Sequence, residues 1–285
     1  RFETFAFAIS SYLRKIPIIH YEGGDVTEGG ALDDNIRHAI TKISNIHLTS
    51  NKDSFNRILN MGEERWRVSV TGEPALTMLH DYDFSKTDFR SELNLSPKDK
   101  FVLATFHPTT YENQPLIKQI NLFVEALDLI KNNIILTAPN ADPGCGLIIT
   151  VLSEYARKRN NVHLFENLGI KIFYAAMVDA LFMIGNSSSG LWEAPSFELP
   201  VINIGPRQDG RVRLCNVIDV GLNVDEINDA IIKANDKNFK YSLKKMKNPY
   251  ARPDTIQRIL SGLKTKKSRE IVLAKTFVDP LFYSS

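Results

Sequence analysis

The sequence lacks the features that mark several specialised protein classes. Its 285 residues include 2 cysteines, Cys145 and Cys215, without the close spacing of a zinc site or a disulfide framework. No run approaches the roughly 18 apolar residues of a membrane span, and no signal peptide is recognisable. The net charge of +2 is too small to indicate nucleic acid or an acidic membrane as a partner. These absences predict a reduced, cytoplasmic protein with no nucleic-acid or membrane partner.

The composition that is present is globular, with alternating secondary structure. The chain is 43% hydrophobic and 24% charged, and its length is sufficient for two domains with their own cores. Amphipathic stretches of helical length separate short apolar runs rich in β-branched residues, which is the βαβ pattern of parallel sheets. Strands are predicted at residues 16–20, 46–49, 68–71, 101–106, 134–138, 162–165, 180–184 and 201–204.

This alternation predicts an α/β fold class with two Rossmann-like domains. A polar stretch at residues 81–100 interrupts the apolar pattern and predicts the domain boundary. The N-terminal domain then covers residues 1–82, the C-terminal domain covers residues 83–265, and residues 266–285 form a segment that can return to the N-terminal domain. Helical periodicity already begins at Phe2, so we expect the N-terminal domain to be truncated at its start.

Ionisable residues crowd the segment 19–38, which follows the predicted buried strand at 16–20. Around a glycine-rich turn it contains His20, Glu22, Asp33, Asp34 and Arg37. Open α/β sheets bind ligands at the carboxyl ends of their strands, and so many ionisable groups are costly to gather unless they hold a polar ligand or move protons. The alternative is a solvated loop in which Asp33 or Asp34 caps the amphipathic helix that follows.

Three further polar segments follow predicted strands, at residues 106–110, 139–144 and 185–190. In the last segment three serines stand between two glycines, ahead of the helix that contains Glu193. Small hydroxyl residues at a helix N-terminus can bind a phosphate, whereas capping alone needs one serine. Glu193, one turn into that helix, suits the hydroxyls of a ribose, or it complements the helix dipole as a first-turn acid.

Two more residues at strand ends allow either a functional or an ordinary interpretation. His107, which precedes Pro108, either contacts a ligand or satisfies its own loop. Arg207, in the loop after the strand at 201–204, either clamps a phosphate or is solvated. The histidines and cysteines show no metal-ligand spacing, so we predict neither a metal nor a cofactor.

Six motifs occur in an order that resembles a known family. They are HYEGG at 20–24, DDNIRHAITK at 33–42, TGEP at 71–74, HPTT at 107–110, GNSSSG at 185–190 and NIGPRQ at 203–208. Together they resemble the hydrolysing UDP-N-acetylglucosamine 2-epimerases of sialic and legionaminic acid synthesis, from residue 1 to about residue 264. The resemblance implies a glycosyltransferase-B-like fold with the active site between two Rossmann-like domains, a UDP-sugar substrate, and a homodimer or homotetramer.

The reaction that the resemblance implies converts UDP-N-acetylglucosamine to N-acetylmannosamine and UDP. Removal of the C2 proton is coupled to loss of UDP, and water then adds to the 2-acetamidoglucal with acid and base assistance. By the resemblance, Glu22 and Asp33 move the protons. His20 lines the pocket, and Arg37 orients the acids or binds phosphate. Asp34 is the alternative to Asp33, because the loop before them leaves the register open.

The resemblance assigns UDP binding mainly to the C-terminal domain. The implied contacts are Arg1, His107, Asn140, Ser187, Ser188, Glu193 and Arg207. It also places an essential aspartate ahead of Arg1, so we expect activity to need residues that precede this sequence. Two alternatives stay open: the same reaction on UDP-2,4-diacetamido-2,4,6-trideoxyglucose of the legionaminic acid route, and a UDP-sugar glycosyltransferase of the same fold. A transferase would use the UDP site but would leave Glu22 and Asp33 with less to do.

Overall fold

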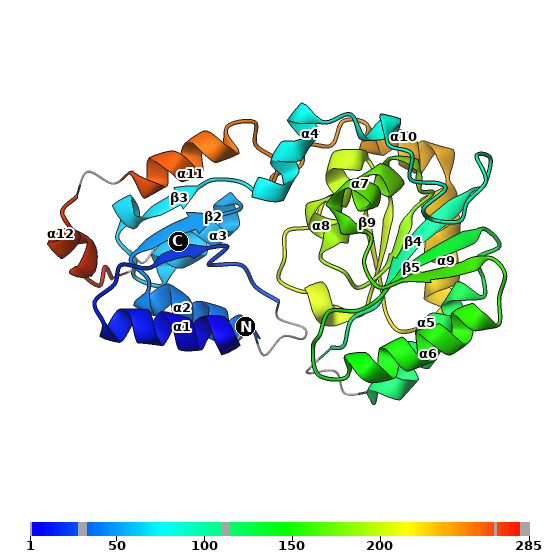
Figure 1. Ribbon diagram of the computed structural model, residues 1–285, viewed down its shortest axis with the longest axis horizontal. Helices are drawn as coiled ribbons and strands as arrows, with labels where there is room; N and C mark the ends of the chain where they lie inside the picture. The colour runs from blue at the N-terminus through cyan, green and yellow to red at the C-terminus, as the bar shows by residue number, and fades with distance from the viewer. Residues whose placement is uncertain (1, 28–32, 110–113, 265–266, 280–285) are drawn as a thin grey trace, which may run out of the picture. The chain divides into compact units, whose positions relative to one another are not determined.

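The chain forms two compact units (Figure 1). The computed structural model describes residues 2–27, 33–109, 114–264 and 267–279. Unit 1 contains the described residues up to 81 and those from 249 onward, and unit 2 contains residues 82–248. The prediction that the C-terminal domain extends to residue 265 is therefore wrong. Helix α11 (Thr255–Leu263) belongs to unit 1 because it packs against strands β2 (Ile46–Thr49) and β3 (Val68–Val70).

Unit 1 is built on a parallel sheet whose described strands lie in the order β1-β2-β3. Strand β1 is Ile19–Tyr21, shorter and later than the predicted strand at 16–20. The prediction that this strand is buried is wrong, since Ile16 is 49% exposed and Ile19 is 45% exposed. Ile16 precedes the strand, and Ile19 lies on an edge, because within the described sheet β1 pairs only with β2.

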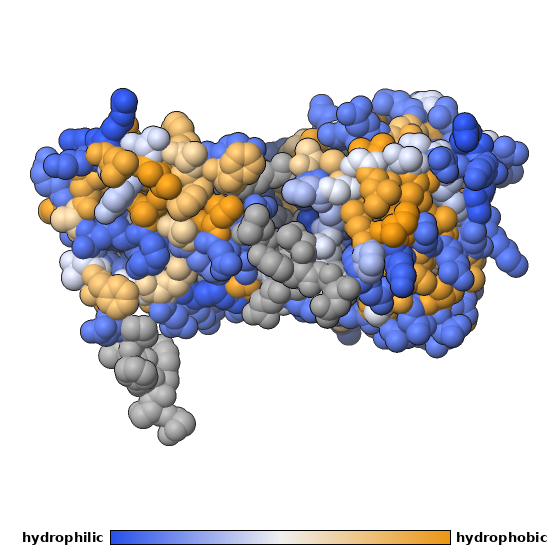
Figure 2. Space-filling view, turned by 90° about the horizontal axis from the view of Figure 1, so that it is seen from below, coloured by the Kyte–Doolittle hydropathy of each residue, from blue (hydrophilic) through white to orange (hydrophobic). Residues whose placement is uncertain are grey.

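Helices cover both faces of this sheet. In Figure 1, α1 (Phe2–Leu13) and α2 (Asp33–Ile43) lie together below it and α11 lies above it. Helix α1 exposes large apolar side chains, and Figure 2 shows apolar residues at the surface of this unit. Such a surface suits burial against further protein, but the homodimer or homotetramer stays a prediction. The other α-helices described in unit 1 are α3 (Lys52–Asn60), α4 (Met78–Asp81) and α12 (Arg269–Leu273).

Unit 2 contains a parallel sheet whose described strands lie in the order β6-β5-β4-β7-β8-β9. Chain order runs outward from β4 to β6 and then outward in the other direction from β7 to β9. Strands β4 and β7 are therefore neighbours at the point where the order reverses, which is where open α/β sheets form a ligand crevice. The strands are β4 (Phe101–Thr105), β5 (Asn133–Thr137), β6 (Val162–Phe165), β7 (Met183–Gly185), β8 (Val201–Ile204) and β9 (Val217–Val220).

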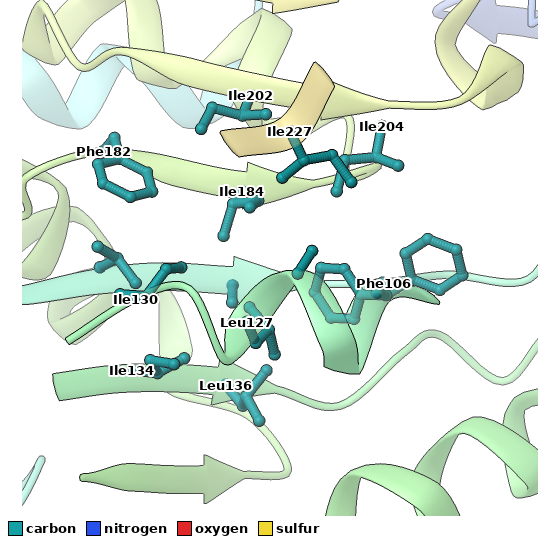
Figure 3. Packing of buried hydrophobic residues seen from close by; sticks show 14 of the residues in the cluster. Phe106, Leu127, Ile130, Ile134, Leu136, Phe182, Ile184, Ile202, Ile204 and Ile227 are labelled. Carbon is teal, nitrogen blue, oxygen red and sulfur yellow. The ribbon is translucent and has the colours of Figure 1, made fainter. Parts of the chain in front are cut away.

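The main hydrophobic core lies on one face of the unit 2 sheet (Figure 3). Alternate residues of β4 and its extension, Val102, Ala104 and Phe106, join side chains of α5 (Leu116–Leu127), α6 (Cys145–Arg157) and α9 (Val224–Asn235). Burial of each large aliphatic side chain stabilises the fold by about 1.5–3 kcal/mol. This packing fixes the strand ends from which the site loops emerge. The remaining α-helices described here are α7 (Gly169–Asp179), α8 (Ser189–Trp192) and α10 (Lys237–Leu243).

No helix in the described part of the chain has the length and apolar character to cross a membrane.

Candidate functional site

A pocket of about 760 Å³ opens in unit 2 at the carboxyl ends of β4, β5 and β7. Four of the predicted UDP-binding residues line it: His107, Asn140, Ser187 and Glu193. Ser188 and Arg207 are not among the lining residues, although Ser188 stands between two that are. Arg1 lies outside the described residues.

The end of β7 can approach β4 only because residue 185 is glycine. Gly185 has a φ of +134°, and a Cβ there would lie 1.8 Å from the carbonyl oxygen of Thr105. A side chain is excluded by both the backbone conformation and the contact with a neighbouring strand. The glycine therefore sets the close approach of the two loops that border the pocket.

Asn186 holds three loops of unit 2 together. Its side chain is buried, its Oδ1 accepts a hydrogen bond from the His107 N–H at 2.7 Å, and its Nδ2 donates to the His107 carbonyl at 2.9 Å. Its own carbonyl accepts from Gln208 Nε2 at 2.7 Å and from Arg207 Nη1 at 3.1 Å. Asn186 lies in the GNSSSG motif, but the sequence alone did not indicate this role. An amide at a strand end between a glycine and serines was the available signal.

His107 is a neutral hydrogen-bond donor at this pocket. Burial lowers its pKa to about 3, and the positive charge of Arg207 adds to the effect. Its Nδ1 accepts a hydrogen bond from the Asn140 N–H at 3.1 Å. A neutral imidazole carries one proton, so that proton lies on Nε2. The structure thus gives His107 a fixed tautomer whose Nε2–H can donate to a ligand oxygen.

The serine segment ends in a shorter helix than predicted. Helix α8 stops at Trp192, so the prediction that Glu193 lies inside the helix is wrong. Pro195 explains the end of the α-helix, because it has no N–H to bond to the carbonyl four residues earlier, and the chain continues as a 3₁₀ turn at Ala194–Phe197. Ser187 Oγ accepts from the Ser189 N–H at 3.3 Å. Glu193 still lines the pocket, where Tyr174 donates a hydrogen bond to its Oε1 at 3.2 Å.

In unit 1 the first of the predicted proton-transfer carboxylates, Glu22, directly follows β1. Glu22 has a φ of +60°, a left-handed conformation that is unusual for a residue with a side chain and marks strain at functional sites. The preceding Tyr21 donates from its hydroxyl to the Gly72 carbonyl at 2.6 Å. Burial raises the pKa of Tyr21, and the charges of Glu73 and Glu22 raise it further. Two carboxylates therefore lie near this phenol, and Glu73, from the TGEP motif, had received no role from the sequence.

Asp34 and Arg37 are partners at the start of α2. Asp34 Oδ1 accepts from Arg37 Nη1 at 2.6 Å and from the Thr27 N–H at 3.0 Å. Arg37 Nη1 also donates to the Asp25 carbonyl at 3.0 Å. Asp34 thus orients the arginine and ties down the preceding loop, while Asp33 is the first residue of the helix.

His20 is neutral like His107 but has the opposite tautomer. Its Nδ1 lies 3.2 Å from Thr41 Oγ1, and that hydroxyl donates its single proton to the Arg37 carbonyl at 3.1 Å. His20 Nδ1 must therefore be the donor of the pair. Burial lowers the pKa of His20 to about 3, with smaller contributions from His47 and Arg37. Its Nε2 consequently carries no proton and can accept a hydrogen bond.

A metal site was not predicted. Among the described residues, no group of three or more His, Cys, Asp and Glu side chains is placed to hold a metal ion.

Comparisons with known proteins identify relatives that match most of the chain. A family model described as UDP-N-acetylglucosamine 2-epimerase matches residues 1–264. The "GDP/UDP-N,N'-diacetylbacillosamine 2-epimerase (hydrolyzing)" of Campylobacter jejuni is 37% identical over 98% of this chain and 73% of its own length. The "UDP-N,N'-diacetylbacillosamine 2-epimerase (hydrolyzing)" of Legionella pneumophila is 34% identical over 96% and 71% of the two chains.

Solved structures show the same fold. The UDP-GlcNAc 2-epimerase of Neisseria meningitidis, bound to UDP-GlcNAc, aligns with a TM-score of 0.74 and 21% identity over 91% of this chain and 73% of that one. The predicted α/β, glycosyltransferase-B-like fold with two Rossmann-like domains is confirmed.

Proposed function

Because the chain belongs to the UDP-N-acetylglucosamine 2-epimerase family, we propose that it catalyses the hydrolysing 2-epimerisation of a UDP-linked 2-acetamido sugar. The products are UDP and the free sugar inverted at C2. The observation that carries this proposal is the extent of the family match, which includes both the carboxylates after β1 and the pocket after β4 and β7. A transferase would not require that carboxylate cluster.

The diacetamido sugar is the favoured substrate. Both relatives described above are named for N,N'-diacetylbacillosamine, which is 2,4-diacetamido-2,4,6-trideoxyglucose. UDP-N-acetylglucosamine, the substrate first predicted from the sequence, is the second candidate, and the family description supports it. The two sugars differ at C4 and C6, so competition between them tests the choice.

UDP is assigned to the unit 2 pocket. The Nε2–H of His107 donates to a phosphate oxygen, and the serines at 187 and 188 offer hydroxyl and backbone donors to the same anion. Arg207 adds positive charge beside His107. Glu193, oriented by Tyr174, accepts from the ribose hydroxyls.

Proton transfer is assigned to unit 1. One of Glu22 and Asp33 takes the proton from C2, the electron pair of that C–H bond forms the C1–C2 double bond, and the C1–O bond to UDP breaks. The proton on the first acid then leaves with UDP. The other carboxyl group, protonated at the start, delivers its proton to the opposite face of C2, water bonds through its oxygen to C1, and the carboxylate so formed takes the proton that the water loses. Positioned carboxyl groups can serve both steps. His20 accepts a hydrogen bond at Nε2, and the Asp34–Arg37 pair orients the loop.

The test is turnover of each sugar nucleotide in deuterated water by the full-length protein. We expect UDP and a free sugar with deuterium at C2, and faster turnover of the diacetamido substrate. A C2-inverted sugar still attached to UDP would contradict hydrolysis. Transfer of the sugar to an added acceptor, or a product without deuterium at C2, would support the transferase alternative.

A further inference from the structure

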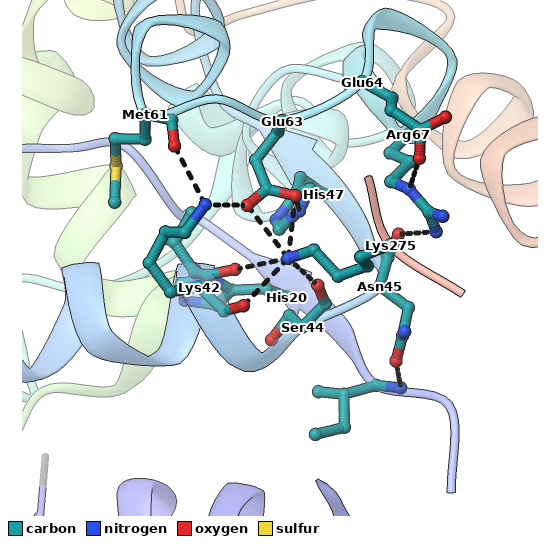
Figure 4. Close-up of polar contacts among 12 residues, drawn as sticks. His20, Lys42, Ser44, Asn45, His47, Met61, Glu63, Glu64, Arg67 and Lys275 are labelled. Carbon is teal, nitrogen blue, oxygen red and sulfur yellow. Dashed lines mark hydrogen bonds and ion pairs between the residues drawn. The ribbon is translucent and has the colours of Figure 1, made fainter. Parts of the chain in front are cut away.

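An ionic cluster in unit 1 is centred on a buried carboxylate and includes His47, whose ring contacts His20 (Figure 4). At its centre is the carboxylate of Glu63, whose side chain is fully buried. Its Oε1 accepts from Lys42 Nζ at 2.8 Å and its Oε2 from Lys275 Nζ at 2.7 Å. His47 Nε2 lies 3.3 Å from the same Oε2. The mechanism above uses none of these groups.

The cluster keeps a negative charge inside the protein. Burial alone would raise the pKa of Glu63, but the hydrogen bonds from His47, Lys275 and Lys42 together lower it to about 2. Burial lowers the pKa of His47, so its imidazole is neutral and donates to Glu63 from Nε2. Glu63 thereby fixes the tautomer and the orientation of the His47 ring.

Lys275 brings the C-terminal segment into this cluster. Its ammonium donates to the carbonyls of Lys42 at 2.9 Å and Ser44 at 2.7 Å, and it lies 3.4 Å from the Thr41 carbonyl. These carbonyls are at the C-terminal end of α2, where a positive charge also complements the helix dipole. The first turn of the same helix carries Asp33 and Asp34.

Two short routes connect the cluster with His20. On the first, Lys275 contacts the backbone of Thr41, and the Thr41 hydroxyl is the partner of His20 Nδ1. On the second, Glu63 bonds His47, whose ring packs edge-on against His20 with 6.4 Å between centroids. Figure 4 shows the His47 ring beside the Glu63 carboxylate.

We propose that Glu63 and Lys275 are positioning residues for the proton-transfer site, so that the C-terminal segment is a working part of that site. They hold Thr41 and His47, which in turn hold His20 in the tautomer that leaves Nε2 free of a proton. The inference rests on the proposed function for its effect on turnover, but its structural part concerns His20 alone.

Stability by itself does not account for these charges. Burial of an ion pair costs desolvation free energy, and apolar side chains of the same volume often serve stability equally well. The segment already has a second anchor, because the buried Arg67 donates to the carbonyls of Val272 at 2.7 Å and Ala274 at 2.8 Å. Phe277 also packs against Gly62 and under Lys42. The ammonium of the half-buried Lys275 adds directional hydrogen bonds, which a positioning role requires.

The test compares Lys275→Met with Arg67→Met, which loosens the same segment but removes no bond to Glu63 or to the carbonyls of Thr41, Lys42 and Ser44, since Arg67 donates to the Asn45 carbonyl instead. Ring ¹⁵N chemical shifts of the histidines report tautomer and need no substrate. We expect Lys275→Met to change the His20 and His47 signals and to lower kcat by about 10- to 100-fold with KM and UDP affinity unchanged, as a small misplacement of reacting groups does. We expect Arg67→Met to lower the melting temperature and leave the His20 signal in place.

If Lys275→Met and Arg67→Met have the same effects on the ring signals and on kcat, the positioning role is wrong and Lys275 is only an anchor. Should Lys275→Met not fold, the double variant Glu63→Gln with Lys275→Met removes the buried carboxylate and ammonium together, and the same His20 shift is expected. Should the wild-type protein turn over neither sugar nucleotide, the proposed function fails, and the ring signals alone decide the positioning role.

Discussion

His20 in unit 1 and His107 in unit 2 have the same low pKa of about 3, for the same reason, and opposite tautomers. His107 accepts at Nδ1 from a backbone N–H and therefore carries its proton on Nε2. His20 donates at Nδ1 to a hydroxyl and therefore leaves Nε2 unprotonated. Burial makes both rings neutral, and a single neighbouring atom decides whether each ring offers a donor or an acceptor.

The two rings also differ in the groups that surround them. Around His107, neutral groups do most of the holding: the Asn186 amide, the Asn140 N–H and backbone carbonyls. Around His20, ion pairs of Asp34 with Arg37 and of Glu63 with Lys275 hold the backbone and the rings. Fixed donors suit an anionic ligand, whereas paired carboxylates suit proton transfer. This contrast is the physical basis for assigning UDP to unit 2 and acid–base chemistry to unit 1.

The largest effect that we expect from a single substitution is on turnover, at Glu22. We expect Glu22→Gln to lower kcat by ~10²-fold or more, because an amide cannot move the proton. The rate at which deuterium appears at C2 of the product should fall in parallel. Glu154→Gln, an exposed carboxylate on α6, is the matched control and should retain wild-type turnover. Wild-type turnover in Glu22→Gln would remove the carboxylate from the mechanism.

The two aspartates of α2 separate chemistry from positioning within unit 1. We expect Asp33→Asn to lower kcat by about 10²-fold with little loss of stability. Asp34→Asn weakens the bonds to Arg37 and Thr27, so it should cost about 1.5–3 kcal/mol of unfolding free energy, the range for a hydrogen bond to a charged group. Denaturant unfolding and steady-state kinetics distinguish the two patterns, and a reversed result would make Asp34 the proton-transfer group.

A smaller effect concerns acid stability. The unfolded chain protonates its histidines below pH 6.5, whereas His20 and His107 stay neutral in the folded state down to about pH 3. Their contribution is therefore fully present above pH 6.5 and is lost as the pH falls towards 3, by about 1.4 kcal/mol per histidine per pH unit.

Unit 1 should be the more acid-sensitive of the two units. Burial also lowers the pKa of His47, and the low pKa of Glu63 adds a loss of the same sign below about pH 4.5. Hydrogen exchange at pH 7 and pH 4.5 should therefore show unit 1 opening first. Equal loss of protection in the two units would mean that the charged and the neutral site respond alike.

The local pattern of apolar and turn residues in the sequence was sufficient to predict much of this fold. Residues 46–49, 162–165 and 201–204 form strands with the predicted bounds, because apolar runs between turn residues specify short buried strands. Strand β9 was missed because Asp219 interrupts a run of only four residues. The exposure of Ile19 and the end of the second domain depend on which elements pack together, and sequence periodicity does not contain that information.

The site shows the same limit. The sequence indicated His20, Glu22, Asp33, His107 and Glu193 because polar residues after strands are visible as motifs. It did not indicate Asn186, Glu63, His47 or Lys275 as partners, because their roles come from contacts between distant segments, such as the 212 positions between Glu63 and Lys275. Nor did it predict that β4 and β7 are neighbours, which is what brings His107 and Asn186 together.

UDP titration by calorimetry with three forms of the full-length protein tests the division of roles most directly. The account predicts that Arg207→Ala weakens UDP binding by about 1.5–3 kcal/mol, the range for a charge-assisted hydrogen bond, and that Glu22→Gln binds UDP like the wild type. If Glu22→Gln weakens UDP as much as Arg207→Ala does while the bound substrate still turns over normally, the cluster after β1 is a binding loop and the account is wrong.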